Sequence, residues 1–386
     1  MEMAMNTTRR NMIFLAGGGV VLAAVGAFGY AATRSPHTAY LPWERAGSYA
    51  DPRMRALSWA LLAPNPHNRQ PWLADLSEAG VITLYADRER MLPQTDPLNR
   101  QITIGLGCFL ELLRMAAAEE GYRAETALFP QGSNDAGLDQ RPVARITLAE
   151  DPAVAKDPLF AQASVRRSNK EPFDVSKPVA VETLDQIAIV VRNGARFGGV
   201  VDLVEVLKWR ALTHEALRIE VETPQTFQES VNLFRIGRRE VDANPDGIDF
   251  SGPLFETLHM TGLFTREMAG DPTSLAYKSG MEAIFANTDT AMGHVWLVTN
   301  DNSRQTQIAT GADWLRVNLA ATSFGLGIQP LSQALQEFPE MAGPFRQAHE
   351  RLAPNGGTVQ MLARIGYGPV VGPSPRWPLE SRIMNA

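Results

Sequence analysis

The sequence predicts an α+β fold in two parts, because helix-forming segments flank short strand-forming segments twice along its 386 residues. Two observations support this prediction. Apolar residues with helical spacing alternate with short runs typical of buried strands. The chain is also long enough for one large domain or two ordinary ones, and 45% of its residues are hydrophobic.

The first part begins with a helix that Asp51 is expected to cap and that ends at Pro64. A broad apolar face that includes Ile102, Leu106 and Phe109 predicts a longer helix over residues 98–120. Short β-forming runs around these helices predict four strands, at residues 72–76, 81–86, 122–129 and 143–148.

The second part is expected to repeat a related pattern, although no repeat is visible as sequence identity. The predicted helices are residues 158–168, 181–192, 208–222, 225–235 and 303–324, and the predicted strands are 294–299 and 358–365. Between them, residues 244–289 are rich in Gly, Pro, Met and Phe with weak periodicity. A tract of this length is usually a lid, an interface or a mobile excursion.

The most informative segment is Ala63-Pro-Asn-Pro-His-Asn-Arg-Gln-Pro-Trp72. Its three prolines exclude a helix interior or a central strand, so it is expected to form a shaped loop. Its amide side chains can donate and accept hydrogen bonds, which suits the edge of a planar heterocycle. An ordinary Asn/Pro turn explains the segment alone equally well.

A second informative segment is Ser164-Val-Arg-Arg-Ser-Asn-Lys-Glu-Pro-Phe-Asp174, which carries three cations within five residues. Such a cluster is more often a solvated face than a ligand site. Its place after a predicted helix, together with the amide-rich loop elsewhere in the chain, favours an anion site here.

The two segments resemble motifs of the nitroreductase-like flavoproteins, whose patterns are Pro-Ser-x-x-Asn-x-Gln-Pro-Trp and Arg-Arg-Ser-x-Arg. Their order is reversed here, which is similar to the Acg-type branch, where one long chain mimics the usual dimer. The resemblance implies a nitroreductase-like fold whose two halves, residues 45–155 and 156–386, form an intramolecular pseudo-dimer. It further implies a lid at residues 244–289, FMN as cofactor, and a monomer in solution.

The resemblance also implies which residues contact FMN. The loop would contribute residues that approach the flavin from one half, namely Pro64, Asn65, Pro66, Asn68 and Gln70. The other half would supply the polar and cationic group Arg166, Arg167, Ser168 and Lys170, and a segment approaching flavin N5, Pro330, Leu331, Ser332 and Gln333. Near the C-terminus, Ser374-Pro-Arg376 resembles a second phosphate clamp, and a solvated tail explains Arg376 equally well.

Residues 1–35 are expected to be a targeting segment. Arg9 and Arg10 precede an uncharged stretch, residues 12–33, that is rich in Ala, Gly, Val and Leu. This pattern resembles a bacterial twin-arginine export signal. A plain membrane anchor is the alternative, because about 20 apolar residues can span a bilayer. The sequence predicts export to the periplasm, with cleavage or anchoring to the inner membrane left open.

Composition excludes several other classes. A net charge of −6 argues against a general nucleic-acid binder. The single cysteine, Cys108, excludes an intramolecular disulfide, and its apolar surroundings predict a buried side chain. No histidines pair at metal-binding spacing, so no metal site is predicted, and no Gly-x-Gly-x-x-Gly follows a strand, which disfavours a dinucleotide site.

The sequence therefore predicts an exported FMN-dependent oxidoreductase that resembles nitroreductases and reduces an unknown small-molecule acceptor by ping-pong electron transfer. No side-chain acid or base stands out, so no catalytic residue is predicted. The main alternative is a protein that sequesters flavin without turnover. A periplasmic solute-binding protein is a third hypothesis.

Overall fold

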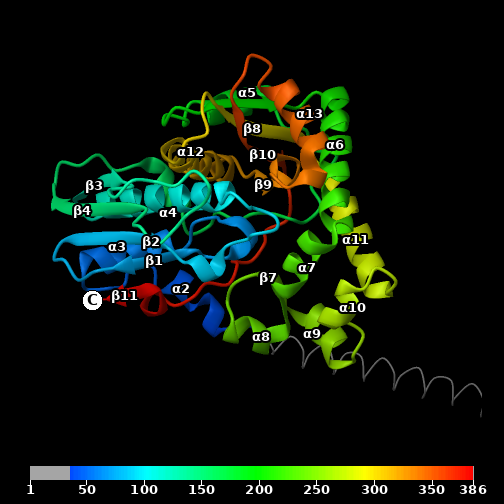
Figure 1. The fold of residues 1–386 in the computed structure, drawn as a ribbon, viewed down its shortest axis with the longest axis horizontal. Coiled ribbons are helices and arrows are strands. Elements are labelled where there is room, and N and C mark those ends of the chain that lie inside the picture. The colour runs from blue at the N-terminus through cyan, green and yellow to red at the C-terminus, as the bar shows by residue number, and fades with distance from the viewer. Residues whose placement is uncertain (1–34, 386) are drawn as a thin grey trace, which may run out of the picture.

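The computed structural model describes residues 35–385 and has two halves, each with a long helix packed on an antiparallel sheet (Figure 1). The predicted α+β class is therefore confirmed. The first half contains α3(Pro52–Ala60), β1(Trp72–Asp75), β2(Val81–Ala86), α4(Arg100–Glu119), β3(Tyr122–Leu128) and β4(Ala144–Glu150). The second contains α5(Val181–Ala188), β5(Arg196–Val200), β8(Gly293–Thr299), α12(Arg304–Ser323), β9(Gly327–Pro330) and β10(Thr358–Gly366).

The two halves share one topology. Four strands of the first sheet have the order β1-β2-β4-β3, and the strands of the second sheet have the order β5-β8-β10-β9. All of these neighbours are antiparallel. Each half also places a short helix before its first strand and its long helix between its second and third strands. The structure thus shows the duplication that sequence identity does not reveal.

The two long helices cross at a pair of glycines, and the contact is reciprocal. A Cβ on Gly107 would lie 2.1 Å from the carbonyl oxygen of Ile308, and one on Gly311 would lie 2.0 Å from that of Ile104. In both helices the facing carbonyl belongs to the residue three positions before the glycine. Two equivalent helices related by an approximate two-fold axis meet in this way, with no room for a side chain.

The first residue of each long helix reaches into the other half. Arg100 donates to the carbonyl oxygens of Gln360 (2.8 Å) and Leu335 (2.5 Å). Arg304 donates in return to the carbonyl oxygen of Leu98 (2.6 Å). Both arginines are almost fully buried, so these charge-assisted bonds tie the halves together in a dry environment.

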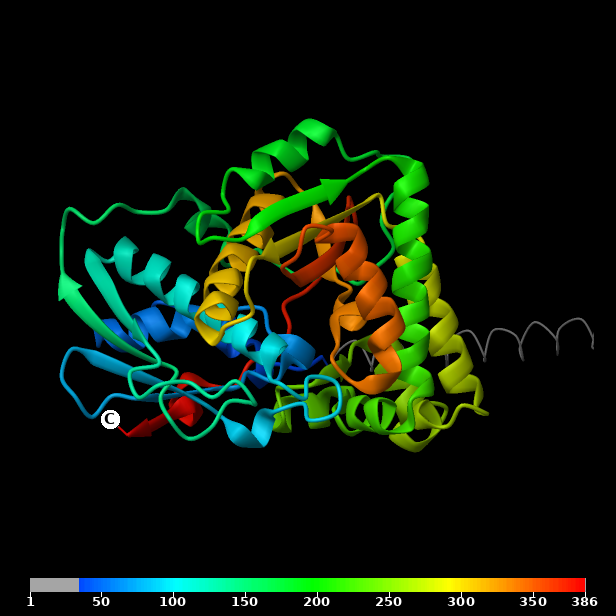
Figure 2. The ribbon, with the colours of Figure 1, turned by 45° about the horizontal axis from the view of Figure 1, so that its top comes forward.

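The halves differ in the connection between their first two strands. A short turn joins β1 to β2, whereas residues 201–292 join β5 to β8 and form a helical insertion (Figure 2). Its elements are α6(Leu203–Glu222), α7(Pro224–Asn232), β6(Phe234–Ile236), α8(Gly237–Ala243), β7(Ile248–Phe250), α9(Pro253–Met260), α10(Arg266–Gly270) and α11(Leu275–Thr288). The lid expected at residues 244–289 is the latter part of this longer insertion, which has a small core of its own that includes Phe234 and Phe264.

The C-terminal segment crosses back to the first half. Its last strand, β11(Ile383–Asn385), pairs in parallel with the outer edge of β1 (Figure 1). The second half was expected to comprise residues 156–386. Its final residues instead pack on the first half, because β11 completes the first sheet. The remaining elements are η1(Thr38–Tyr40), α2(Leu41–Glu44), η2(Pro66–Asn68), η3(Arg88–Arg90), η4(Pro158–Gln162), η5(Ser332–Leu335), η6(Pro339–Met341), α13(Ala342–Leu352) and η7(Leu379–Arg382).

The helix expected at residues 158–168 is wrong beyond its first turn. Only the 3-10 helix η4 forms there, because Ser168 makes a parallel β-bridge with Ile328 and its backbone must be extended. Cys108 is buried as predicted, and burial raises the pKa of its thiol to about 12. Among the described residues, α4 alone is long and apolar enough to cross a membrane, and it is mostly buried inside the protein.

Candidate functional site

The amide-rich loop follows α3 and has an unusual backbone. Three of its non-glycine residues have positive φ angles, at His67 (48°), Asn68 (51°) and Gln70 (51°). Each such residue costs about 1–3 kcal/mol where the left-handed conformation is disfavoured, and asparagine tolerates it best. Strained residues of this kind persist only where their surroundings hold them, and they cluster at functional sites.

The loop is seated on the N-terminal half of α4. A Cβ on Gly105 would come 3.1 Å from the Asn65 Cβ and 3.3 Å from the Pro66 Cδ. A side chain at this helix position would therefore push the loop away. Buried Pro64 joins α3 to the loop, and the Asn65 side chain closes the loop by accepting a hydrogen bond from the Gln70 amide (2.7 Å).

The amide side chains of Asn68 and Gln70 are engaged by the protein. Asn68 donates to the carbonyl oxygen of Pro375 (3.0 Å). Gln70, which is fully buried, accepts from the backbone amide of Trp377 (2.9 Å) and donates to the carbonyl oxygen of Pro245 (2.6 Å). In this arrangement the two amides lock the loop to the C-terminal segment and to the insertion, rather than facing an open site.

The arginine-rich segment lies against the same loop, although it comes from the other half. Arg166 is 3% exposed and donates through Nη2 to the carbonyl oxygen of Leu62 (3.2 Å). Its Nη1 is buried and has no hydrogen-bond partner among the described residues. Burial, with a smaller contribution from Arg167, lowers the pKa of Arg166 to about 10.

The other two cations of this segment border the same region. The Arg167 guanidinium lies 4.4 Å from the ring centroid of Trp43, and its Nε is buried without a partner in the described part of the chain. Lys170 is exposed and makes no ion pair within residues 35–385. Desolvation by the surrounding protein lowers the pKa of Lys170, and nearby Asp249 partly offsets this effect.

The segment that follows β9 completes the convergence. Buried Leu331 donates its amide to Leu362, and the half-buried Ser332 hydroxyl contacts the Gln101 side chain on the first turn of α4 (3.1 Å). Half-buried Pro330 and Gln333 flank these two residues. Since the Ser168 bridge fixes the arginine-rich segment to β9, three of the predicted segments meet near the N-terminal half of α4.

The chain is similar in sequence to known proteins over most of its length. A Mycobacterium tuberculosis protein with the provisional name NAD(P)H nitroreductase is 25% identical over 335 residues, which cover 83% of this chain and 87% of that protein. A second protein from that organism, provisionally named NAD(P)H nitroreductase acg, is 24% identical over 330 residues, which cover 83% and 90% of the two chains. The chain is a homologue of the Acg-type nitroreductase-like proteins.

No family model matches this chain. A solved Anabaena variabilis protein, provisionally named a nitroreductase, is 12% identical with a TM-score of 0.37, and the match covers 75% of this chain and 69% of that one. The FMN-dependent nitroreductase NfnB of Mycobacterium smegmatis, solved with NADPH, is 16% identical with a TM-score of 0.34 over 56% and 92% of the chains. These TM-scores correspond to a partial overlap of the chains. The fold is defined by the sheets and helices described above.

Arg376 holds the amide-rich loop in place. The side chain is 2% exposed and donates to the carbonyl oxygens of Leu61 (2.7 Å) and Ala63 (3.2 Å), and to the Asn68 side chain (2.6 Å). Further bonds reach the carbonyl oxygens of Leu62 and Pro375 and the hydroxyl of Ser374. All three of its nitrogens thus face protein acceptors, so the expected phosphate contact of Arg376 is not prepared in this arrangement.

One part of the site escaped sequence reasoning. Asp246, at the start of the expected lid, is 5% exposed and pairs with Arg69 (2.8 Å), Arg90 (2.7 Å) and Arg235 (2.9 Å). Arg69 belongs to the amide-rich loop, so the insertion is fastened directly to that loop. A cation in the middle of an otherwise uncharged loop was the one sequence signal for this cluster.

A second missed contact joins the insertion to the N-terminal segment of the described chain. The Tyr40 hydroxyl donates to Asp249 (3.2 Å), and burial with the Asp249 charge raises the pKa of Tyr40 to about 12. Burial, together with the positive charges of Lys170 and Arg69, lowers the pKa of His67 to about 4. Within residues 35–385, no three His, Cys, Asp or Glu side chains are grouped so that they could hold a metal ion.

Proposed function

We propose that this chain binds one FMN between its two halves and acts as a nitroreductase-like oxidoreductase. One observation carries the proposal: buried Arg166 Nη1 and Arg167 Nε lack partners at the place where the amide-rich loop from the other half meets them. Buried cationic donors are costly to leave unpaired, and an anionic ligand would satisfy them.

The residues suit FMN in chemical terms. A phosphate and the N1–C2=O edge of a flavin both require cations or N–H donors, which Arg166, Arg167 and Lys170 would supply. The backbone of residues 64–66 would line one side of the ring, and residues 330–333 with Ser168 would line another. When bound, FMN supplies the hydride or electron transfer.

The chain's own contribution would then be position and charge. The fixed positive charges of Arg166 and Arg167 would favour the form of a bound group that carries more negative charge. Their geometry needs no rearrangement, because the Leu62 carbonyl and the Trp43 ring already hold the two side chains. No side chain of the described region is assigned a proton-transfer role.

The direct test is the visible absorption spectrum of the protein purified without added cofactor. We expect a flavin spectrum, and FMN in the supernatant after denaturation. A colourless protein that also fails to take up added FMN would refute the proposal and favour the solute-binding alternative.

A second candidate is flavin sequestration without turnover. The insertion supports it, since Asp246 pairs with Arg69, Pro245 accepts from Gln70, and the Gly247 amide donates to the Asn68 carbonyl (3.3 Å). A lid fastened in this way would limit access to the flavin. Steady reduction of nitroaromatics or quinones with a supplied reductant favours the enzyme, whereas a bound flavin that never turns over favours sequestration.

The proposal extends to location and assembly. The twin-arginine pattern lies in residues 1–34, outside the described residues, and it supports export with the cofactor already bound. Replacing both Arg9 and Arg10 by lysine is expected to retain the protein in the cytoplasm of a bacterial host. Because one chain supplies both half-sites, we expect a monomer by light scattering, with or without anchoring to the inner membrane.

A further inference from the structure

A cavity lies beside the C-terminal halves of the two long helices. It measures about 340 Å³ and is lined by side chains from α4, α12 and the segments next to η4 and α5. From Gly105, where the loop is seated, to Arg114, which lines this cavity, the helix rises about 13 Å. None of the residues predicted to contact FMN lines it. We propose that this cavity binds a phosphate-type oxyanion.

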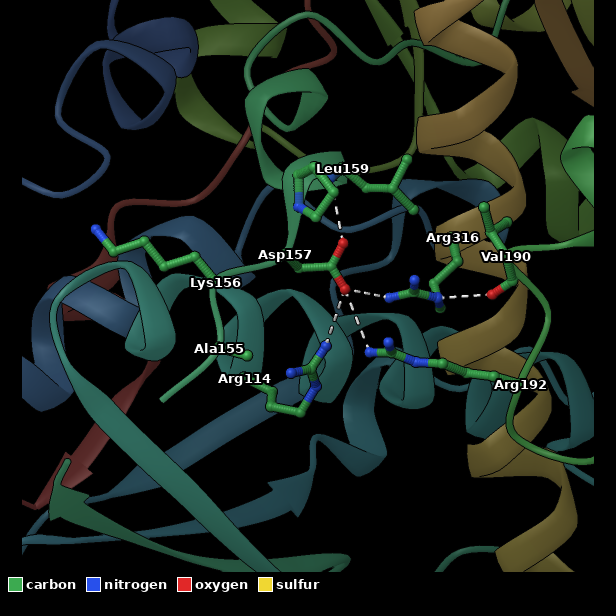
Figure 3. A pocket seen from close by; sticks show the side chains of 9 residues that line it. Arg114, Ala155, Lys156, Asp157, Leu159, Val190, Arg192 and Arg316 are labelled. Carbon is green, nitrogen blue, oxygen red and sulfur yellow. Dashed lines mark hydrogen bonds and ion pairs between the residues drawn. The ribbon is translucent and has the colours of Figure 1, made fainter. Parts of the chain in front are cut away.

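Three guanidinium groups converge in the cavity. Figure 3 shows Arg114, Arg192 and Arg316 directed at the carboxylate of Asp157 from different sides. The distances to its Oδ2 atom are 3.5 Å from Arg114, 3.2 Å from Arg192 and 2.5 Å from Arg316. Three cations of one sign held so close together repel one another unless anions compensate them.

The protein compensates them only in part. The second carboxylate of the cluster is Glu111, which accepts hydrogen bonds from Nε (2.8 Å) and Nη2 (2.9 Å) of Arg114. Two carboxylates against three guanidiniums leave an excess of one positive charge. At the rim, Lys156 lies 3.5 Å from Glu119 and adds no net charge. The ion-paired side chains of the cluster are therefore short of one anion, and the nearby buried carboxylate of Asp313 is occupied by the backbone amides of Arg192, Asn193 and Ala195.

Unused donors face the same space. Nη2 of Arg316, Nη1 of Arg114, and Nε and Nη1 of Arg192 make no hydrogen bond with any described residue. The Arg316 residue is only 5% exposed, but its Nη2 atom is accessible to solvent. This atom therefore reaches the cavity that Arg316 lines. Arg192 is exposed and stands at the mouth.

The arrangement selects the shape of the anion. One guanidinium fork matches both oxygens of a planar carboxylate within a single plane. Donors from two helices and a loop approach from several directions, which matches the tetrahedral oxygens of phosphate. The cavity is also large enough for a phosphate that carries a small organic group.

The test measures binding of inorganic phosphate by titration calorimetry in a phosphate-free buffer at low ionic strength. The FMN-loaded protein is used, so that a flavin phosphate site is already filled. We expect one site per chain and clearly weaker binding of acetate. Arg192→Gln removes one unused donor pair from the exposed mouth and should weaken phosphate binding about tenfold.

A control variant locates the site. Arg196→Gln removes an equally exposed arginine from neighbouring β5, outside the cavity, and should leave phosphate affinity unchanged. Equal phosphate affinity in the wild type and Arg192→Gln, loss of binding in Arg196→Gln, or acetate binding as tight as phosphate overturns the proposal.

A phosphomonoester, ribose 5-phosphate, distinguishes the two sources of the oxyanion. Tighter binding of the ester identifies an organic phosphate as the ligand, and tighter binding of the free ion identifies inorganic phosphate; either result supports the site. No binding of either compound at about 10 mM in a folded wild-type protein refutes it.

Discussion

The crossing of α4 and α12 can be tested by adding one methyl group. Gly311→Ala would place a Cβ 2.0 Å from the Ile104 carbonyl oxygen and 2.7 Å from the Gly107 Cα. Both of these neighbours are backbone atoms, so no side chain can rotate out of the way. The helices would have to separate by more than about 1 Å to restore ordinary contact distances of roughly 3.5 Å.

The expected loss of stability follows from two opposing effects. Alanine is favoured over glycine by about 1 kcal/mol in a helix interior. Overpacking a core typically costs about 1–3 kcal/mol, and a rigid backbone neighbour places this site at or above the upper end. We therefore expect Gly311→Ala to lower the free energy of unfolding by at least about 2 kcal/mol, or Tm by about 2–3 °C for a chain of this size.

Calorimetry or thermal circular dichroism measures this change, and the pseudo-symmetry supplies a strict comparison. Gly107→Ala meets the equivalent carbonyl at 2.1 Å and should cost the same within error. Gly280→Ala and Gly343→Ala are matched controls, because both positions are helical and have no atom within 4 Å of the added Cβ. These controls should be neutral or slightly stabilising. A Gly311→Ala protein as stable as its controls would refute the reciprocal crossing.

Three further predictions concern charged groups. Arg166→Met should reduce FMN retention at least about tenfold, measured by flavin released on dialysis, while Arg218→Met on an exposed part of α6 leaves it unchanged. Asp246→Asn removes the carboxylate shared by Arg69, Arg90 and Arg235, of which only Arg90 keeps a second carboxylate partner among the described residues, Asp87. It should lower the free energy of unfolding by about 3 kcal/mol in urea titrations, whereas removing the exposed ion pair with Glu215→Gln should change it by less than about 1 kcal/mol. Burial lowers the pKa of His294 to about 3, so between pH 7 and 5 the unfolded chain takes up a proton that the folded chain does not. The wild type should therefore lose about 2 kcal/mol more than His294→Phe over that interval, and equal pH slopes would contradict the burial of a neutral His294.

The sequence predicted correctly those helices and strands whose formation depends on neighbouring residues. Helices α4 and α12 lie within two residues of the expected ranges 98–120 and 303–324, because each carries a sustained apolar periodicity and a clear stop. Asp51 caps α3 as predicted, accepting from the Arg53 amide (2.7 Å). Strands β8 and β10 form where the sequence predicted strands, at residues 294–299 and 358–365.

What the sequence could not predict depends on partners distant along the chain. Residue type gives the hydrogen-bonding capacity of Asn68 and Gln70 but not the groups that use it, and Pro375 and Trp377 are more than 300 residues away. Two of the partners of Asp246, Arg69 and Arg90, are also remote, at 177 and 156 residues along the chain. The duplication was invisible in the sequence for another reason. Strand order and helix crossing require only that certain residues be buried or small, so two halves can keep the same topology without any sequence identity.

The duplication also explains why one chain should hold one flavin. Gly107 matches Gly311 and Arg100 matches Arg304, so the equivalent of Gly105 on α12 is residue 309, an alanine. The loop after α5 is anchored elsewhere, on buried Asp313, which accepts the Arg192 amide (2.8 Å). Only α4 has the glycine on which the amide-rich loop is seated, and only the second half carries the arginine-rich segment. Because each half lacks one of these two segments, the two halves together carry the parts of one proposed site and not of two.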